Sequence, residues 1–471
     1  MNDTPRKLRL GEKICYGFGD LASCLFWQTI TFYLLFFYTD VFGITAKAAG
    51  IMFFVSRISD AIFDVVVGML ADRTRSRWGK FRPYLLWIAV PLGVSAVLAF
   101  TTPGFGETGK LVYAYITFIL FMFMYSAINI PYTALLGVIS GDPVERADAA
   151  TSKFIGAYLA GIIVSAAALP LVKYLGGENA GRGWQLTMGV FAVTAVVLFL
   201  ITFAATRERI QPIAKEKTSI GNDLKDLTRN VPWMLLFVVT ILFILFVCIR
   251  LSVTTHYFKY YIGEQEVTLF GTTHKYGFEV LASAFNTVGQ LLSLVGVGLV
   301  PVVVRFLGRK KAVLVLFVTA LICTGAFYVF KPENLVLIFV FQAIGSISGG
   351  PISALLWLMY ADTADYSEWK TGRRATGLVF SASIMSNKVG WAIGSMIAGA
   401  ILASTGFVAN VEQNADVQHG LKAMMSIIPA GVGTVALILL FFYGLNEKVM
   451  AKVKGELDAK RTAGGEARPA A

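Results

Sequence analysis

Twelve apolar stretches, each about twenty or more residues long, constrain the fold more than any other feature of this sequence. A helix of that length spans the hydrocarbon core of a bilayer, and it satisfies its own backbone hydrogen bonds there. We therefore predict an all-α membrane protein with twelve transmembrane helices. The stretches cover residues 15–39, 46–71, 83–102, 110–139, 152–175, 185–205, 232–262, 277–303, 311–330, 335–360, 376–404 and 420–445.

The composition agrees with this class. Hydrophobic residues make up 56% of the chain and charged residues only 15%, against about 25% charged residues in soluble proteins. The net charge of +12 could suggest a nucleic-acid partner, but about thirty of the 41 Lys and Arg residues fall in the two termini and the loops on their side. This positive-inside distribution predicts a multi-pass membrane protein with both termini cytoplasmic, and no nucleic-acid partner.

The longest polar interruption divides the twelve stretches into two sets of six. We predict an N-terminal six-helix bundle over 1–205, a cytoplasmic middle loop over 206–231, a C-terminal six-helix bundle over 232–445 and a cytoplasmic tail over 446–471, disordered past Gly455. Short basic loops occur at the same place in each half, at 72–82 and 305–311. Such an echo is typical of transporters built from two repeats.

Charged side chains in the stretch 46–71 indicate a site. Arg57, Asp60 and Asp64 are spaced so that they share one face of a helix. Charges at that depth cost a few kcal/mol each, and they usually mark an ion or substrate path. A structural ion pair between Arg57 and one acid is the alternative, but it leaves the second acid over. We predict that Asp60 and Asp64 bind a coupling cation, and that they are the metal ligands if the cation is Na⁺.

The stretch 110–139 supplies further oxygen atoms. Ser126, Asn129 and Thr133 share a face, and Pro131 frees a backbone carbonyl one turn earlier. With the two acids, these groups form an oxygen-rich site suited to Na⁺, whereas the acids alone would serve H⁺. A packing kink at Pro131 is the structural alternative and does not exclude the site.

The stretch 15–39 carries a polar face on an otherwise apolar helix. An acid, an indole and an amide on one face suit a sugar, because polar groups bond hydroxyls and the ring stacks on the pyranose. Polar contacts between helices are the alternative. The face comprises Asp20, Cys24, Trp27, Gln28 and Thr31.

The stretch 376–404 contains Lys388 near its middle, followed by Trp391. A lysine at that depth needs an acid nearby, and Asp60, Asp64 and Asp20 are the candidates. Lys388 is either a structural counter-ion or a sugar ligand. The segment 362–374 reads as a charged cytoplasmic loop, either a charge lock between the halves or a solvated loop.

No residue pattern supports an enzyme. The sequence has three His and four Cys, no metal-ligand spacing, no phosphate-binding loop and no nucleophile with its base. We expect no cofactor other than the coupling cation.

Several motifs resemble one family closely, over essentially the whole chain. The chain is similar to the glycoside–pentoside–hexuronide:cation symporters of the major facilitator superfamily, which include melibiose permease. The matching stretches are Tyr16–Asp20, Tyr38–Gly43, Arg57–Asp64, Thr74–Pro83, Asn129–Tyr132 and Ala361–Tyr366.

The resemblance implies the major facilitator fold, cation ligation by Asp60, Asp64 and Ser126, and sugar contacts from Asn129 and Thr133. It also implies sugar contacts from the 15–39 face and a position for Lys388 close to both sites. The sugar pocket departs from that of melibiose permease. Asn129 replaces a sugar-binding Asp, Cys24 replaces another, and Phe154 stands beside Lys153 where a functional Arg is found.

We therefore predict a cation-coupled sugar or glycoside symporter that works by alternating access. Its partners would be a small sugar, a monovalent cation and membrane lipid. A cation-coupled lysolipid transporter of the same superfamily is the alternative, because lipid-carrying relatives exist. A sensor is a third possibility, but the short tail offers no output domain. The identity of the sugar and the choice between Na⁺ and H⁺ stay open.

Overall fold

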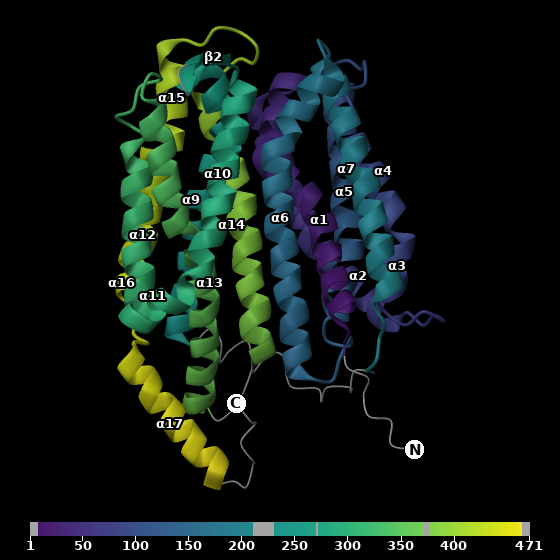
Figure 1. Ribbon diagram of the computed structural model, residues 1–471, viewed down its shortest axis with the longest axis vertical. Coiled ribbons are helices and arrows are strands. Elements are labelled where there is room, and N and C mark those ends of the chain that lie inside the picture. The colour runs from purple at the N-terminus through teal and green to yellow at the C-terminus, as the bar shows by residue number, and fades with distance from the viewer. Residues whose placement is uncertain (1–7, 211–229, 270–271, 372–375, 464–471) are drawn as a thin grey trace. The chain divides into compact units, whose positions relative to one another are not determined.

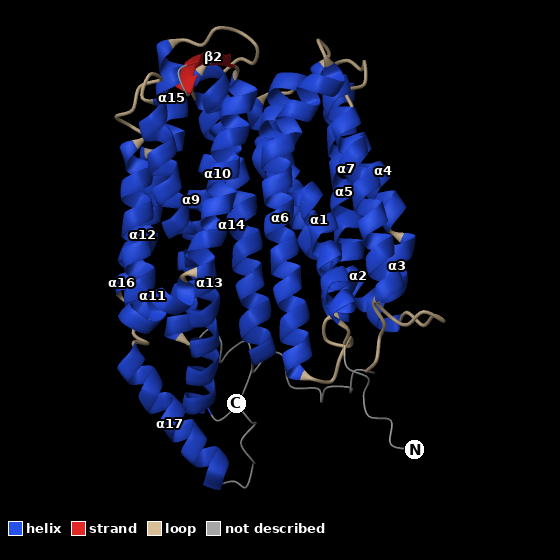
Figure 2. Cartoon of the chain, in the orientation of Figure 1, coloured by secondary structure: helices blue, strands red, loops and turns tan. Residues whose placement is uncertain are grey.

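The computed structural model describes residues 8–210, 230–269, 272–371 and 376–463. Most of the predicted middle loop, the end of the tail and Gly372–Arg374 of the charged segment therefore lie outside the described residues. Helices account for most of the described chain, and one small hairpin supplies its strands (Figure 2). The predicted helical class is thus confirmed.

The chain forms two compact units that interleave in sequence. The first unit comprises 1–214, 251–290 and 395–422. The second comprises 215–250, 291–394 and 423–471. The six-and-six division of the helices stays a prediction.

The first unit contains the N-terminal helices and the hairpin (Figure 1). In the hairpin the strands pair antiparallel with Gln265 opposite Tyr276, and an exposed ion pair with Lys275 lowers the pKa of Glu264. The elements of this unit are α1 (Leu10–Phe36), the π-helix η1 (Phe37–Phe42), α2 (Ala46–Arg73), α3 (Arg82–Trp87), α4 (Ala89–Ala99), α5 (Glu107–Leu135), α6 (Pro143–Gly176), α7 (Ala180–Ala205), the π-helix η2 (Phe258–Ile262), β1 (Gln265–Leu269) and β2 (Thr272–Tyr276).

The second unit is helical in its described part, and its core is built from aromatic and aliphatic side chains such as Phe243, Phe317 and Leu355. Four helices pass from one unit into the other: α9 (Val231–Tyr257), α10 (Phe278–Gly298), α14 (Thr376–Ser404) and α15 (Ala415–Met425). The others of this unit are α11 (Val300–Leu307), α12 (Arg309–Ala326), α13 (Leu335–Thr371), α16 (Ile427–Phe441) and α17 (Glu447–Ala463).

Each predicted apolar stretch is helical, and eight helical spans among the described residues are long and apolar enough to cross a membrane. The stretches 83–102, 277–303 and 420–445 are each broken into two helices. Every break lies two or three residues before a proline, at Pro91, Pro301 and Pro429. Proline removes a backbone donor, and its ring clashes with the carbonyl four residues earlier, which explains these positions. Pro131, Pro170 and Pro351 nevertheless lie inside unbroken helices.

The burial pattern of α2 is the reverse of that of a soluble helix. Ile62 and Val65 are 60% and 63% exposed, whereas Arg57 and Asp60 are only 7% and 4% exposed. A bilayer requires this arrangement, in which apolar side chains face the surroundings and charged side chains face the protein.

Glycines let α1 and α6 approach each other closely. A Cβ atom added to Gly17 would lie 2.5 Å from the carbonyl oxygen of Ser152, so the two backbones are in contact there. Small residues at such crossings are common in membrane proteins, because packing replaces the hydrophobic effect between helices. This crossing holds the polar face of α1 against α6.

Two expectations about the charged segments 362–374 and 446–471 are wrong. Residues 362–371 continue α13 as a helix rather than forming a loop, and the tail beyond Gly455 is helical in α17 up to Ala463. Ion pairs and packing explain both. Asp362 pairs with Arg309 and lies 3.9 Å from Lys454 of α17, while Met450 of α17 is buried in the core of the second unit.

Candidate functional site

The predicted cation-site residues meet between α2 and α5. Ser126 Oγ lies 2.7 Å from Asp60 Oδ1 and 2.9 Å from Asp64 Oδ1, and Ser126 is only 3% exposed. A hydroxyl has one hydrogen and donates one strong hydrogen bond. The second short contact is therefore stable when a proton or a cation is shared between the oxygens. This arrangement of three oxygens can hold H⁺ or a small hard cation.

Arg57 connects this face of α2 to α1. Its guanidinium lies 4.3 Å from the centre of the Trp27 ring, and Trp27 also stacks on Tyr125 of α5 with ring centres 5.4 Å apart. The indole that we expected to stack on a sugar thus packs against an arginine and a tyrosine. Trp27 accordingly lies between the predicted sugar face and the cation site.

One residue that we did not predict for the site brings Asp20 and Thr133 together. Lys153 of α6 places its Nζ 3.8 Å from Asp20 Oδ1 and donates to Thr133 Oγ1 at 3.3 Å. Cys24 Sγ lies 3.9 Å from Asp20 Oδ2. A basic residue at the entrance of an apolar stretch was the available signal. In the comparison with melibiose permease, Lys153 is noted only as the neighbour of Phe154 and not as a site residue.

Asn129 follows Ser126 by one turn of α5. Its side-chain oxygen is buried and accepts no hydrogen bond from the described residues. Buried acceptors without a partner are uncommon in folded proteins, and a ligand or a water usually satisfies them. Asn129 is thus placed and chemically free to contact a polar ligand.

The two predicted ligands on α14 belong to the second unit. Trp391 packs against the core of that unit, and its carbonyl oxygen lies 4.0 Å from Cys248 Sγ. Lys388 lies one turn before Trp391 on the same helix. The pairing of Lys388 with Asp60, Asp64 or Asp20 stays a prediction.

Comparison with known proteins places the chain in a family. The profile of the MFS/sugar transport protein family matches residues 15–447. This chain belongs to that family. The isoprimeverose transporter of Lactiplantibacillus pentosus is 36% identical over 456 residues, which cover 95% of this chain and 91% of that one. A putative glycoside/cation symporter of Escherichia coli (strain K12) is 34% identical, with 98% of each chain covered.

Solved structures agree on the fold. The crystal structure of a point mutant of the nucleoside transporter NupG covers 92% of this chain and all of its own, with a TM-score of 0.65 and 13% sequence identity. The resemblance stated from the motifs is therefore confirmed at the level of the family. The chain is a membrane transporter of the sugar-transport class, and family membership favours sugars over lysolipids as its cargo.

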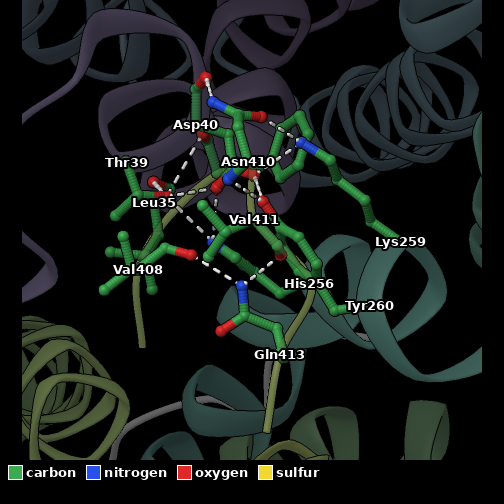
Figure 3. A network of polar contacts seen from close by, with 11 residues as sticks. Leu35, Thr39, Asp40, His256, Lys259, Tyr260, Val408, Asn410, Val411 and Gln413 are labelled. Atoms are coloured by element: carbon green, nitrogen blue, oxygen red, sulfur yellow. Dashed lines mark hydrogen bonds and ion pairs between the residues drawn. The ribbon is translucent and has the colours of Figure 1, made fainter. Parts of the chain in front are cut away.

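A second polar cluster of this sugar-transport family member surrounds Asp40 at the end of η1 (Figure 3). The carboxylate is almost fully buried, with 1% of its side chain exposed. Lys259 Nζ lies 2.8 Å from Asp40 Oδ1, and Tyr260 donates its hydroxyl to the same oxygen. Thr39 Oγ1 donates to Asp40 Oδ2 at 2.7 Å, and His256 Nε2 lies 3.3 Å from that oxygen.

A loop near residue 410 completes this Asp40 cluster. Asn410 Nδ2 donates to the carbonyl oxygen of Asp40 at 2.7 Å, and Asn410 Oδ1 accepts from Lys259 at 2.6 Å. Asn410 has a φ of 59°, in the left-handed region that asparagine tolerates better than most residues. Three segments far apart in the sequence thus converge on one buried carboxylate.

Sequence reasoning did not find the Asp40 cluster. The sequence indicates Asp40 only through the motif Tyr38–Gly43 and gives no reason to select His256. The available signals were a buried-looking acid in a family motif and a Lys at the end of an apolar stretch. Spacing alone could not pair residues more than two hundred positions apart.

Proposed function

We propose that this chain is a cation-coupled glycoside symporter of the bacterial inner membrane. The observation that carries the proposal is the contact of Ser126 with both Asp60 and Asp64 inside a helix pair whose outer face is apolar. Those three residues would bind Na⁺ or H⁺, which is a transported partner rather than a resident cofactor. The names of the relatives, an isoprimeverose transporter and a glycoside/cation symporter, support a glycoside as cargo.

The proposed sugar ligands lie along α1 and on the helices beside it. Asp20 and Thr133, bridged by Lys153, would bond sugar hydroxyls, and Asn129 supplies a side-chain oxygen that has no hydrogen-bond donor among the described residues. Trp27 and Gln28 continue the same face of α1. Lys388 and Trp391 would join the site from the C-terminal bundle.

The proposed mechanism is alternating access in a fold of twelve transmembrane helices, arranged as two six-helix bundles with both termini cytoplasmic. The Asp40 cluster supports a two-state cycle, because it joins the end of η1 to residues 256–260 and 410 from the other half of the sequence. We infer that this cluster is closed when the site is shut to the outside, and that it separates when the site opens there.

Uptake into proteoliposomes tests the proposal. Isoprimeverose and a panel of methyl glycosides would be offered under an imposed gradient of Na⁺ or of H⁺. We expect accumulation driven by one of the two gradients. Because coupling is a reciprocal linkage, the cation should raise sugar affinity by the factor by which sugar raises cation affinity.

Replacing one acid separates coupling from binding. Asp64→Asn should abolish accumulation against a gradient while leaving measurable sugar binding. The control is Asp416→Asn, which removes an exposed carboxylate from α15 and should transport normally. If Asp64→Asn still concentrates sugar, the cation site is not where we place it.

A further inference from the structure

A polar stripe on α10 faces the N-terminal helices of the first unit. Asn286, Thr287 and Gln290 lie three and four residues apart, so they share one face of the helix. Thr287 Oγ1 donates to Ser165 Oγ of α6 at 3.1 Å, which fixes that face against α6. The polar stripe of α10 therefore lies at the boundary between α10 and α6.

Gln290 and Gln28 converge on one glycine. A Cβ atom added to Gly161 of α6 would lie 2.8 Å from Gln290 Oε1 and 3.3 Å from Gln28 Nε2. Gly161 therefore leaves room for two amide side chains, one from α1 and one from α10. Both glutamines are half-buried rather than exposed.

These amides lack protein partners within the described part of the chain. Neither Gln28 nor Gln290 forms a hydrogen bond with another described residue. Asn286, a residue 4% exposed, lies beside the Tyr33 hydroxyl, but its side-chain nitrogen makes no well-formed hydrogen bond with the described residues. Amides that served only to hold helices together would hydrogen-bond each other across the gap. Two glutamine amides without a described partner, together with the unsatisfied N–H of Asn286, instead match the hydroxyl groups of a carbohydrate.

The spacing along α1 gives the length of the ligand. Gln28 lies eight residues after Asp20, which is about 12 Å along a helix. The group formed by Asp20, Lys153 and Thr133 thus lies at one end of the polar face, and the amide group lies at the other. That separation exceeds one pyranose ring and suits a two-ring sugar.

We propose that Gln28, Asn286 and Gln290 form a second sugar subsite, which binds the hydroxyl groups of the second ring of a disaccharide or an extended glycoside. This inference rests on the proposed function, because it assigns a ligand to the same transport site. It adds α10 to that site and makes Gly161 a residue that sets its width.

The test measures sugar binding to the purified full-length protein by equilibrium titration. The probes are isoprimeverose and a set of other disaccharides, together with the methyl glycosides of their single rings. We expect Gln290→Ala and Gly161→Ala each to raise the Kd for the bound disaccharide about tenfold, the effect of losing one or two hydrogen bonds. The Kd for single-ring glycosides should change less than twofold.

A matched glycine variant controls for folding. Gly189 of α7 is also helical, but a Cβ atom there would meet nothing within 4 Å, so Gly189→Ala should bind every probe like the parent protein. Gly161→Ala should stay folded too, because the added Cβ crowds only the movable ends of the Gln290 and Gln28 side chains. Melting temperatures of the three variants check this.

The outcomes separate the two proposals. If the parent protein binds disaccharides and both Gln290→Ala and Gly161→Ala bind them equally well, the second subsite is wrong and the symporter proposal stands. Equal losses for one-ring and two-ring probes would also overturn the subsite. If the parent protein binds no sugar of the panel with either cation, the proposed function fails, and the inference fails with it.

Discussion

Removing the acceptor at the centre of the Asp40 cluster should open the transporter toward the outside. In Asp40→Asn the side chain keeps its shape but has one acceptor oxygen instead of two. In the parent protein, four donors point at the carboxylate of Asp40, from Thr39, His256, Lys259 and Tyr260. The variant therefore leaves donors of the closed arrangement unsatisfied and removes the counter-charge of Lys259.

The magnitude follows from the burial of the pair. Breaking a buried ion pair by removing one partner costs about 3–5 kcal/mol. Lys259 is 21% exposed and keeps its contact with Asn410 Oδ1 at 2.6 Å, so water and that amide offset part of the loss. We expect the closed arrangement to lose about 2 kcal/mol, which shifts the population of the open state about 30-fold.

A cysteine of the chain itself reports on this shift. Cys24 lies 3.9 Å from Asp20 at the proposed sugar site, and the free cysteines Cys15, Cys248 and Cys323 can be replaced by serine. An impermeant maleimide added to right-side-out vesicles should then label Cys24 about 30-fold faster in Asp40→Asn, the ratio expected from the population shift.

A control variant shows whether the change in labelling rate is specific to the Asp40 cluster. Glu264→Gln removes an ion pair with Lys275 whose side chains are 60% and 64% exposed, so its labelling rate should equal that of the parent. The reasoning is refuted if Asp40→Asn is folded, binds sugar and shows the labelling rate of the parent protein.

Three further variants test the other contacts. Ser126→Ala should weaken the apparent cation affinity about tenfold, as expected for a hydrogen bond to a charged group, while sugar binding without cation is unchanged in titrations. Lys153→Met should leave the buried Asp20 without its ammonium partner and lower sugar affinity about tenfold, whereas cation binding measured without sugar stays the same. Asp362→Asn should lower the melting temperature by a few degrees with little effect on ligand affinity, because its partners Arg309 and Lys454 hold α17 in place.

The helices could be predicted from the sequence because a bilayer imposes a simple length and polarity rule on them. The breaks at 88, 299 and 426 could not, although each lies just before a proline. Pro131 and Pro351 carry the same local signal and yet lie in continuous helices. A proline alone therefore does not decide whether a helix breaks in this chain, so the positions of the breaks could not be read from the prolines.

The charged helical segments at the end of α13 and in α17 show a similar limit. The segment 362–371 and the tail are rich in charged residues, which is typical of solvated loops. In the structure Asp362 meets Arg309 and Lys454, and Trp369 Nε1 donates to Glu456 Oε2 at 2.6 Å. Each segment gives the other its partners, so neither could be predicted to be ordered when read by itself.

The residues of the candidate site also differ in how far the sequence indicates them. Asp60 and Asp64 stood out because a charge in an apolar helix is costly, and the cost itself marks the position. Ser126 is uncharged and was indicated only by the face that it shares with Asn129 and Thr133 and by the resemblance to the symporter family.

Gln28 and Gln290 carry no charge, so the cost argument does not select them, and only Gln28 was indicated, by the polar face of the stretch 15–39. Their convergence at Gly161 depends on a glycine in a third helix, which leaves no pattern in the spacing of either glutamine. Uncharged polar residues that complete a transport site should therefore be sought where a glycine in one helix faces amides from two others.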